Sequence, residues 1–329
     1  MSPRLKLGFD NYSIRALKWK APQLLAYAAS LKLDTVLFSD LDVYEHLTDD
    51  YLHGIRSMAE DLGIEIQAGT GGICKTSGFW NGKWGPPEKL LQTTIRVAKI
   101  LRSPVARCYL GWIGDRQTHG GIRTHMKSVI QTCKKLRSYA VNSGVRIAVE
   151  NHAGDMQSQE LVSLIHEAGT DFMGATLDTG NAVWTMEDPA ATTIETLGKY
   201  AVSTGIRDSA VWETTHGAAF EWKAMGDGQV DWKAFFKRYA QICPKTPVQL
   251  EIITGPAREL PYLKPEYWKP WREAPAEGFA RYVSFARRGK APKPYAVKKG
   301  LTAEQTWQKA TLERSITYCK KVLGLGLKK

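Results

Sequence analysis

The chain has no long apolar run. No stretch approaches the roughly 20 apolar residues that a membrane helix requires, and residues 1–8 contain no apolar segment of signal-peptide length. We therefore expect a soluble, cytoplasmic protein without a membrane partner. Cysteine is also scarce: the five cysteines are widely spaced and never form a Cys-x-x-Cys pair. This pattern excludes a zinc ribbon and gives no disulfide framework.

Excess charge is missing from most of the chain. The formal net charge is +12, but residues 256–329 hold 17 Lys and Arg against 6 Asp and Glu, a net charge of +11. Residues 1–255 are therefore almost neutral. Lysine and arginine in the tail are the only compositional support for contacts with nucleic-acid phosphates, a partner that we do not expect.

A dinucleotide fingerprint is absent as well, since no Gly-x-Gly-x-x-Gly follows the first apolar run. Short apolar runs instead alternate with amphipathic helical patterns, as in parallel βα units. The expected strands are residues 5–10, 34–40, 64–68, 105–110, 145–150, 173–177, 201–206 and 248–253. The expected helices are residues 21–33, 49–62, 86–101, 122–142, 158–168, 189–197 and 231–242. Eight repeats of roughly 30 residues predict an α/β fold of the closed (β/α)8 type, a TIM barrel, over residues 1–255.

Residues 256–329 break this pattern. They contain seven of the fifteen prolines and an aromatic run at 262–271, which predicts an arm lying extended on the barrel surface. A last helix is expected from Thr302, where a capping-box pattern begins, to just before Gly324. The arm would pack on its own barrel or on a neighbouring subunit, and we expect a homo-oligomer.

Three of the last four strands end on acids: Glu150, Asp178 and Glu251. The carboxyl ends of all strands meet at one face of a barrel, where the acids would repel one another. A divalent cation between them would relieve the repulsion. Two simpler interpretations stay open: each acid pairs with Arg or Lys, and Asp178 begins a turn. Arg107 could likewise face the barrel mouth or pair with an acid.

Four motifs now occur in a particular order: Glu-Asn-His from residue 150, Leu-Asp-Thr-Gly-Asn from 177, Ile-Arg-Asp from 206 and Leu-Glu-Ile from 250. This order resembles the sugar isomerase/epimerase superfamily of xylose isomerase-like TIM barrels. That superfamily includes tagatose 3-epimerase-like enzymes, inosose dehydratases, C-glycoside-cleaving lyases and endonuclease IV-like DNA repair enzymes. The resemblance covers about residues 5–255.

The resemblance implies that Glu150, Asp178 and Glu251 bind a divalent metal (Mn²⁺, Mg²⁺, Co²⁺ or Zn²⁺). It also implies that the two glutamates accept and donate protons on a sugar. His152, Asn181 and Arg207 would contact the substrate. The superfamily's fourth ligand is the histidine that begins a His-x-(Lys/Arg)-Asp motif on strand seven, where this chain has Gly205-Ile206-Arg207-Asp208. Either water or His216 would complete the coordination, or the metal would be weakly bound or lost.

The leading functional hypothesis is thus a metal-dependent isomerase or epimerase of a carbohydrate or keto-sugar that works through an enediolate. Three alternatives stay open. The first is a lyase or dehydratase of a keto-glycoside or keto-inositol, and the second is an endonuclease IV-like enzyme. The third is a non-catalytic, sugar-binding barrel.

Overall fold

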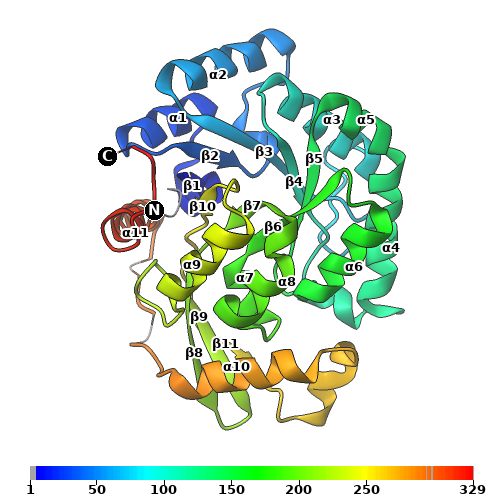
Figure 1. Ribbon diagram of the computed structural model, residues 1–329, viewed down its shortest axis with the longest axis vertical. Helices are drawn as coiled ribbons and strands as arrows, with labels where there is room; N and C mark the ends of the chain where they lie inside the picture. Colours follow the sequence, from blue (N-terminus) through cyan, green and yellow to red (C-terminus); the bar gives the residue numbers. More distant parts are fainter. Residues whose placement is uncertain (1–4, 294, 298, 329) are drawn as a thin grey trace.

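The computed structural model describes residues 5–293, 295–297 and 299–328. Residues 1–4 of the predicted barrel segment and residues 294, 298 and 329 of the predicted tail lie outside the described residues. Its centre is a parallel eight-stranded sheet in the order β10-β1-β2-β3-β4-β5-β6-β7. The strands are β1 (Leu7–Asp10), β2 (Thr35–Phe38), β3 (Glu65–Gly72), β4 (Val105–Tyr109), β5 (Arg146–Glu150), β6 (Met173–Asp178), β7 (Ala201–Gly205) and β10 (Val248–Leu250). A parallel bridge from Ile206 to Leu250 joins the two edges. The predicted barrel is confirmed (Figure 1).

Helices surround the barrel. They are α1 (Ala21–Ser30), α2 (Asp49–Leu62), α3 (Pro87–Ile100), α4 (Gly121–Lys135), α5 (Arg137–Ser143), α6 (Ser158–Ala168), α7 (Thr179–Trp184), α8 (Ile194–Leu197) and α9 (Trp232–Ile242). The single helix predicted over residues 122–142 is wrong, because the backbone of Leu136 leaves the helical region at φ −102° and ψ 5° and separates α4 from α5. Among the described residues, no helix combines the length and apolar composition that crossing a bilayer requires.

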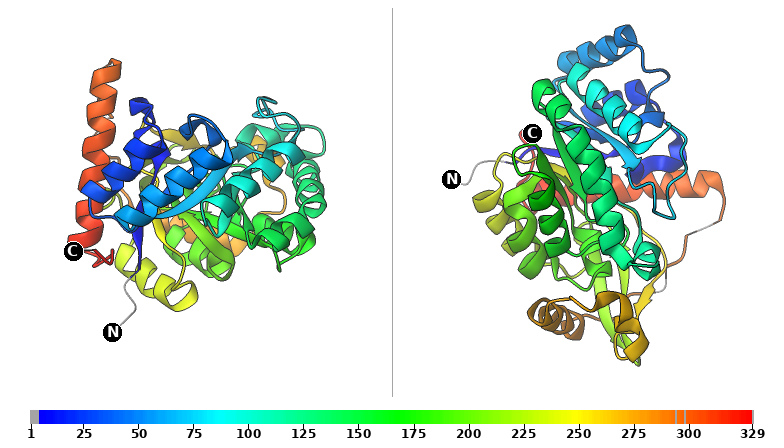
Figure 2. Two further views of the ribbon diagram at one scale, coloured as in Figure 1. Left: turned by 90° about the horizontal axis from the view of Figure 1, so that it is seen from above. Right: turned by 90° about the vertical axis from the view of Figure 1, so that its right-hand side faces the viewer.

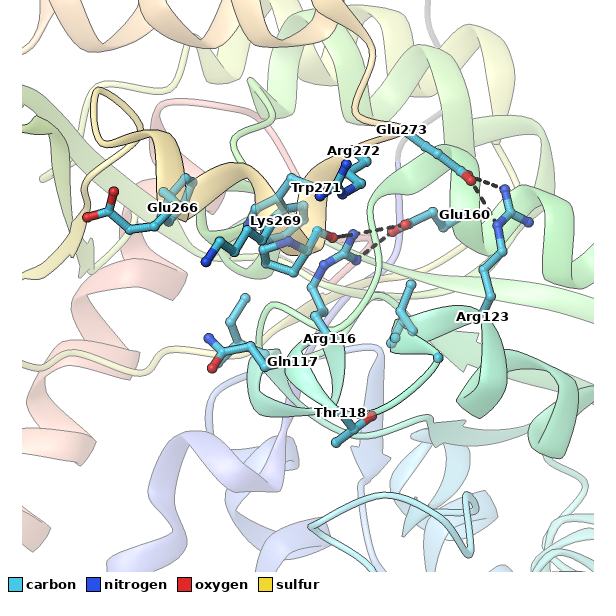
Figure 3. Close-up of a pocket in the computed structure, with 16 residues that line it drawn as sticks. Arg116, Gln117, Thr118, Arg123, Glu160, Glu266, Lys269, Trp271, Arg272 and Glu273 are labelled. Carbon is cyan, nitrogen blue, oxygen red and sulfur yellow. Dashed lines mark hydrogen bonds and ion pairs between the residues drawn. The ribbon is translucent and has the colours of Figure 1, made fainter.

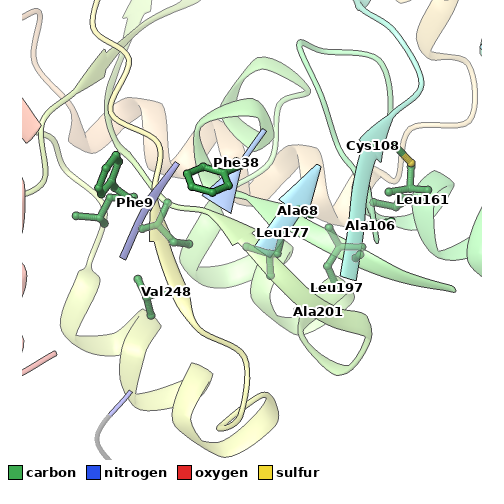
Figure 4. Packing of buried hydrophobic residues seen from close by; sticks show 14 of the residues in the cluster. Phe9, Phe38, Ala68, Ala106, Cys108, Leu161, Leu177, Leu197, Ala201 and Val248 are labelled. Carbon is green, nitrogen blue, oxygen red and sulfur yellow. The ribbon is translucent and has the colours of Figure 1, made fainter. Parts of the chain in front are cut away.

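The core lies between the strands and this layer of helices (Figure 4). Phe9 of β1 and Phe38 of β2 are fully buried, as are Leu161 of α6 and Leu197 of α8. Successive strand residues point alternately into the barrel and toward the helices. The rigid packing of both layers fixes the strand ends, and with them the side chains that begin the loops at the barrel mouth.

A small antiparallel sheet extends from the barrel after β7. Its strands are β8 (Asp208–Thr214), β9 (Gly217–Lys223) and β11 (Arg258–Leu260), in the order β11-β9-β8. The sequence interpretation assigned no strand between residues 206 and 231, so it missed this hairpin. Val211 and Phe220 pair across the hairpin, and both are buried. Figure 1 shows this sheet at the lower end of the molecule.

The tail is folded rather than extended along its length. A 3₁₀ segment, η6 (Pro265–Trp271), leads to α10 (Ala276–Arg288), and α11 (Leu301–Lys321) follows. The predicted extended arm missed α10, whose Tyr282, Phe285 and Ala286 recur at helical spacing and are buried. The final helix occurs close to its predicted range.

Helix α11 packs on the outside of the barrel (Figure 2). The backbone N–H of Ala16, in the 3₁₀ segment η1 (Asn11–Leu17), donates to Gln308 Oε1 at 2.9 Å. Near the middle of α11, Ser315 Oγ accepts a hydrogen bond from Met225 N at 3.1 Å. Polar contacts at two levels therefore hold this helix against the barrel of the same chain.

Glu187 is a buried acid outside the barrel mouth. Its carboxylate accepts hydrogen bonds from the backbone N–H and the hydroxyl of Ser158, each at 3.0 Å, and from Thr185 Oγ1 at 3.1 Å. Burial raises the pKa of Glu187 from 4.5 to about 7 despite these donors. Because the pKa of Glu187 is higher in the folded state, this group contributes fully to the free energy of unfolding below its unfolded-state pKa. The contribution is lost as the pH rises through about 7.

Replacing Glu187 with glutamine should therefore flatten the pH dependence of stability. Between pH 5 and pH 8, we expect the wild type to lose about 2 kcal/mol more free energy of unfolding than Glu187→Gln. Urea unfolding at both pH values measures the difference. Glu167→Gln, at an exposed position of α6, should keep the wild-type dependence. Equal slopes for the wild type and Glu187→Gln would contradict the expectation.

Candidate functional site

Three acids meet at the carboxyl ends of the barrel strands. Glu150 is the last residue of β5, Asp178 is the last residue of β6, and Glu251 directly follows β10. One carboxylate oxygen of each lies within 4.8 Å of the others, and all three residues are buried. The structure thus brings together the three acids that the sequence placed at strand ends. His216 does not join them, because it lies in the exposed turn between β8 and β9.

The guanidinium of Arg207 lies on two of these acids. Its Nη2 donates to Asp178 Oδ2 at 2.7 Å, and its Nη1 donates to Glu251 Oε2 at 2.8 Å. The ring of Trp222 lies under the guanidinium, 4.4 Å from the Arg207 Cζ to the ring centroid. The side chain of Arg207 is 1% exposed. The sequence interpretation made Arg207 a substrate contact, which stays a prediction, and the structure shows Arg207 as the ion-pair partner of Asp178 and Glu251.

Arg107 of β4 neutralises the third acid. Its Nε donates to Glu150 Oε2 at 2.7 Å, and its Nη2 is also in ion-pair contact with that carboxylate. Asn181 Nδ2 donates to Glu150 Oε1 at 3.2 Å. Both simpler interpretations are therefore observed: each strand-end acid pairs with an arginine, and Asp178 caps α7 by accepting a hydrogen bond from Asn181 N at 2.6 Å. The sequence left the orientation of Arg107 undecided, because alternation along a strand does not say which acid a side chain reaches.

Burial and the two arginines act in opposite directions on the acids. Burial raises the pKa of Asp178 well above its usual value, and burial also raises the pKa of Glu150 against the effect of Arg107. Burial acts likewise on Glu251, but there the charge of Arg207, a hydrogen bond with Asp178 and the charge of Arg107 together outweigh it and lower the pKa. Glu251 is consequently the acid of the group that stays ionised most readily. Two buried carboxyls with opposed proton affinities are typical of acid–base sites.

A cavity of about 420 Å³ opens beside this cluster. Glu251, Arg207, Asn181 and His152 line it, whereas Glu150 lies beneath Arg107 and Asn181. The ring of His152 stacks on Tyr109 at 3.7 Å between centroids, and its Nδ1 lies 2.6 Å from the carbonyl oxygen of Gly111. Burial, together with Arg107, lowers the pKa of His152 to about 4, so this imidazole is neutral at neutral pH.

Several residues of the cavity wall were missed by the sequence interpretation. Phe79, Trp184 and Trp222 give it aromatic sides, and Arg258 enters from β11 in the tail. The guanidinium of Arg258 lies over the rings of Trp184 and Trp222, and its buried Nη1 has no hydrogen-bond partner among the described residues. The aromatic rings are suited to contact the apolar faces of a sugar, and the guanidinium is suited to bind a negatively charged substituent. The tryptophans at positions 184 and 222, close to the acids at strand ends, were the sequence signal that could have indicated this wall.

The three carboxylates have the chemistry of a divalent-metal site, but their surroundings do not fit one. A side chain at position 205 would point at the group, since a Cβ there would lie 2.5 Å from Asp178 Oδ2 and 3.2 Å from Glu251 Oε2. Those two oxygen atoms are the ones that hold the Arg207 guanidinium. An ion coordinated by Asp178 and Glu251 would have to displace it.

A second hollow, of about 670 Å³, lies between the start of α4 and η6 (Figure 3). Arg116 crosses it, bonded to both carboxylate oxygens of Glu160 at 2.8 and 3.0 Å and stacked 3.7 Å from the ring of Trp271. These contacts hold the tail against the barrel. The three strand-end acids do not line this hollow, so we assign it no part in the candidate site.

Comparison with solved structures gives similar barrels. A D-psicose 3-epimerase crystallised in the presence of D-fructose has a TM-score of 0.65 at 16% identity, over 97% of this chain and 100% of that chain. A D-psicose 3-epimerase from Clostridium cellulolyticum H10, with D-tagatose, has a TM-score of 0.57 at 15% identity, covering 86% and 96%. A xylose isomerase domain protein from Planctomyces limnophilus has 0.56 at 14%, covering 76% and 92%. At these identities the likeness shows the fold.

No curated protein matches the sequence. The model of one protein family, described as the xylose isomerase-like TIM barrel, matches residues 25–277. The match extends over most of the chain and includes all three strand-end acids. The resemblance drawn from the four sequence motifs is thereby confirmed. This chain belongs to the family of xylose isomerase-like TIM barrels.

Proposed function

We propose that the protein is an enzyme that isomerises or epimerises a carbohydrate by moving a proton on the carbon next to a carbonyl. The observation that carries this proposal is Glu251, which lines the cavity and is held by a hydrogen bond from Arg207, whose charge lowers the pKa of this carboxyl. A carboxylate held in this way is suited to accept a proton from a bound sugar. The positive charges of Arg207 and Arg107 then lie where negative charge develops on the substrate oxygens.

Glu150 has a different part in this proposal. It lies behind the cavity wall, where it holds Arg107 and Asn181. We therefore assign it a positioning role and assign proton transfer to Glu251. The sequence interpretation gave both glutamates a catalytic role on opposite faces of the sugar. Because Glu251 lines the cavity and Glu150 does not, we favour proton transfer on a single face of the sugar, as in isomerisation between neighbouring carbons.

The walls of the cavity support a ketose as the substrate class. Two of the similar epimerases were crystallised in the presence of D-fructose and with D-tagatose, and both sugars are ketoses. Phe79, Trp184 and Trp222 offer flat apolar faces to a sugar ring. Arg258, with its free Nη1, would additionally accept a substrate with a carboxylate, such as a keto-uronate. A lyase acting on a keto-glycoside would use the same first proton transfer.

The test is to incubate the protein with D-fructose, D-tagatose, D-psicose, L-ribulose and a keto-uronate in D₂O and to follow proton NMR. We expect one of these sugars to exchange hydrogen for deuterium next to its carbonyl and to give a new product. Glu167→Gln, altered on an exposed helix face, should act as the wild type does. If folded wild-type protein neither exchanges nor converts any of the sugars, the proposal is overturned in favour of a non-catalytic barrel.

A further inference from the structure

We propose that the guanidinium of Arg207 takes the place of the divalent metal ion at this barrel mouth, so that a side chain of the protein supplies the fixed positive charge. The resemblance implied a metal ion held by Glu150, Asp178 and Glu251. The structure instead offers an internal cation on two of these three acids. The catalytic meaning of this inference rests on the proposed function, but the inference about binding can be tested without turnover.

The first support for this inference is the position of the Arg207 guanidinium. Arg207 bonds to Asp178 Oδ2 and Glu251 Oε2, and these are the two oxygen atoms toward which position 205 points. The superfamily resemblance puts a metal-binding histidine at that position, where this chain has Gly205. This chain therefore lacks the histidine ligand. Arg207, which matches the Lys or Arg that the superfamily motif has two residues later, places its guanidinium on the same two oxygen atoms.

Three consecutive residues, beginning with the last residue of β6, surround the side chain of Arg207. Asp178 accepts a hydrogen bond from its guanidinium. The hydroxyl of Thr179 accepts a hydrogen bond from Arg207 N at 3.0 Å and lies 2.9 Å from Arg207 O, to which it donates. Gly180 leaves room for the stem, because a Cβ there would lie 1.9 Å from Arg207 Nε and 2.4 Å from Cδ. The backbone, the stem and the charge of Arg207 are therefore all fixed from one segment.

Trp222 contacts Arg207 on the side opposite to residues 178–180. Its ring lies under the guanidinium, and its Nε1 donates to the carbonyl oxygen of Gly180 at 2.8 Å. A guanidinium keeps its charge at every pH at which proteins are studied, and it presents several N–H donors in one plane. In the proposed reaction it would hold a developing oxyanion by hydrogen bonds, and unlike a metal ion it would not activate water.

The decisive experiment is a metal titration of the wild-type protein. After dialysis against MnCl₂ and then metal-free buffer, we expect elemental analysis to find far less than one ion per chain. We also expect Tm to stay the same with added Mn²⁺, Co²⁺, Mg²⁺ or Zn²⁺ and with EDTA. One bound ion per chain that raises Tm and is removed by EDTA would overturn the proposal, whether or not the protein turns over a sugar.

A double variant should gain the metal binding that we expect the wild-type protein to lack. Gly205→His together with Arg207→Ala restores the histidine of the superfamily pattern and removes the internal cation. We expect this double variant to gain a Tm that rises with added Mn²⁺, which would support the proposal. Absence of any sugar conversion, with the wild type still metal-free, would reject the proposed function and leave the assignment of Arg207 supported.

Discussion

Replacement of Glu251 by glutamine should lower kcat for the sugar substrate by roughly 10²–10⁴-fold, because an amide cannot accept a proton from carbon. Glutamine keeps the size of the side chain and one oxygen that can accept a hydrogen bond from Arg207. The effect is therefore expected in kcat rather than in KM. Steady-state kinetics and deuterium exchange into the sugar in D₂O measure it. Both should fall together, because both depend on the same proton transfer.

The matched control is Glu259→Gln, at an exposed position of β11 next to the cavity residue Arg258. It removes a carboxylate from the neighbourhood without touching the acid cluster, and we expect wild-type kinetics. Thermal unfolding of both variants checks that the fold is retained. If Glu251→Gln is folded and exchanges deuterium at the wild-type rate, Glu251 is not the group that takes the proton.

Removal of Arg207 should be the most destabilising single change at the site. Arg207→Ala leaves Asp178 and Glu251 buried without their cation, and breaking a buried pair in this way costs about 3–5 kcal/mol of the free energy of unfolding. The loss should be smaller at pH 5 than at pH 8, because protonation of the two acids relieves the unpaired charge. Urea unfolding at both pH values gives the two numbers.

Gly180→Ala should produce nearly the same loss without touching any charge, because the new methyl group would overlap the stem of Arg207. The double variant Gly180→Ala with Arg207→Ala should be about as stable as Arg207→Ala alone, since each change removes the same contact. Gly54→Ala, in α2 with open space around it, is the matched control and should be neutral or slightly stabilising. Additive losses in the double variant would mean that Gly180 does not act through Arg207.

Much of the fold is predictable from local pattern. The eight strands alternate with helices at a regular period, and short apolar runs can hardly be placed elsewhere than in a parallel barrel. The predictions fail where the pattern is interrupted. The hairpin of β8 and β9 is buried over most of its length although its sequence mixes polar and apolar residues, and α10 follows a proline-rich segment that looks extended. In both cases the apolar residues are buried by partners distant in the sequence, which no local window contains.

The sequence by itself determined that Glu150, Asp178 and Glu251 gather at one mouth, because each acid ends a parallel strand and the strand ends of a barrel converge. It also marked Gly205 as a departure from the superfamily pattern. Only the tertiary structure decided what neutralises the acids. Arg107 pairs with Glu150. Arg207 reaches Asp178 and Glu251 through space left by Gly180 and against the ring of Trp222. Such a pairing depends on side-chain directions at the ends of five strands, β4, β5, β6, β7 and β10, so the order of residues alone could not decide between a metal ion and an arginine.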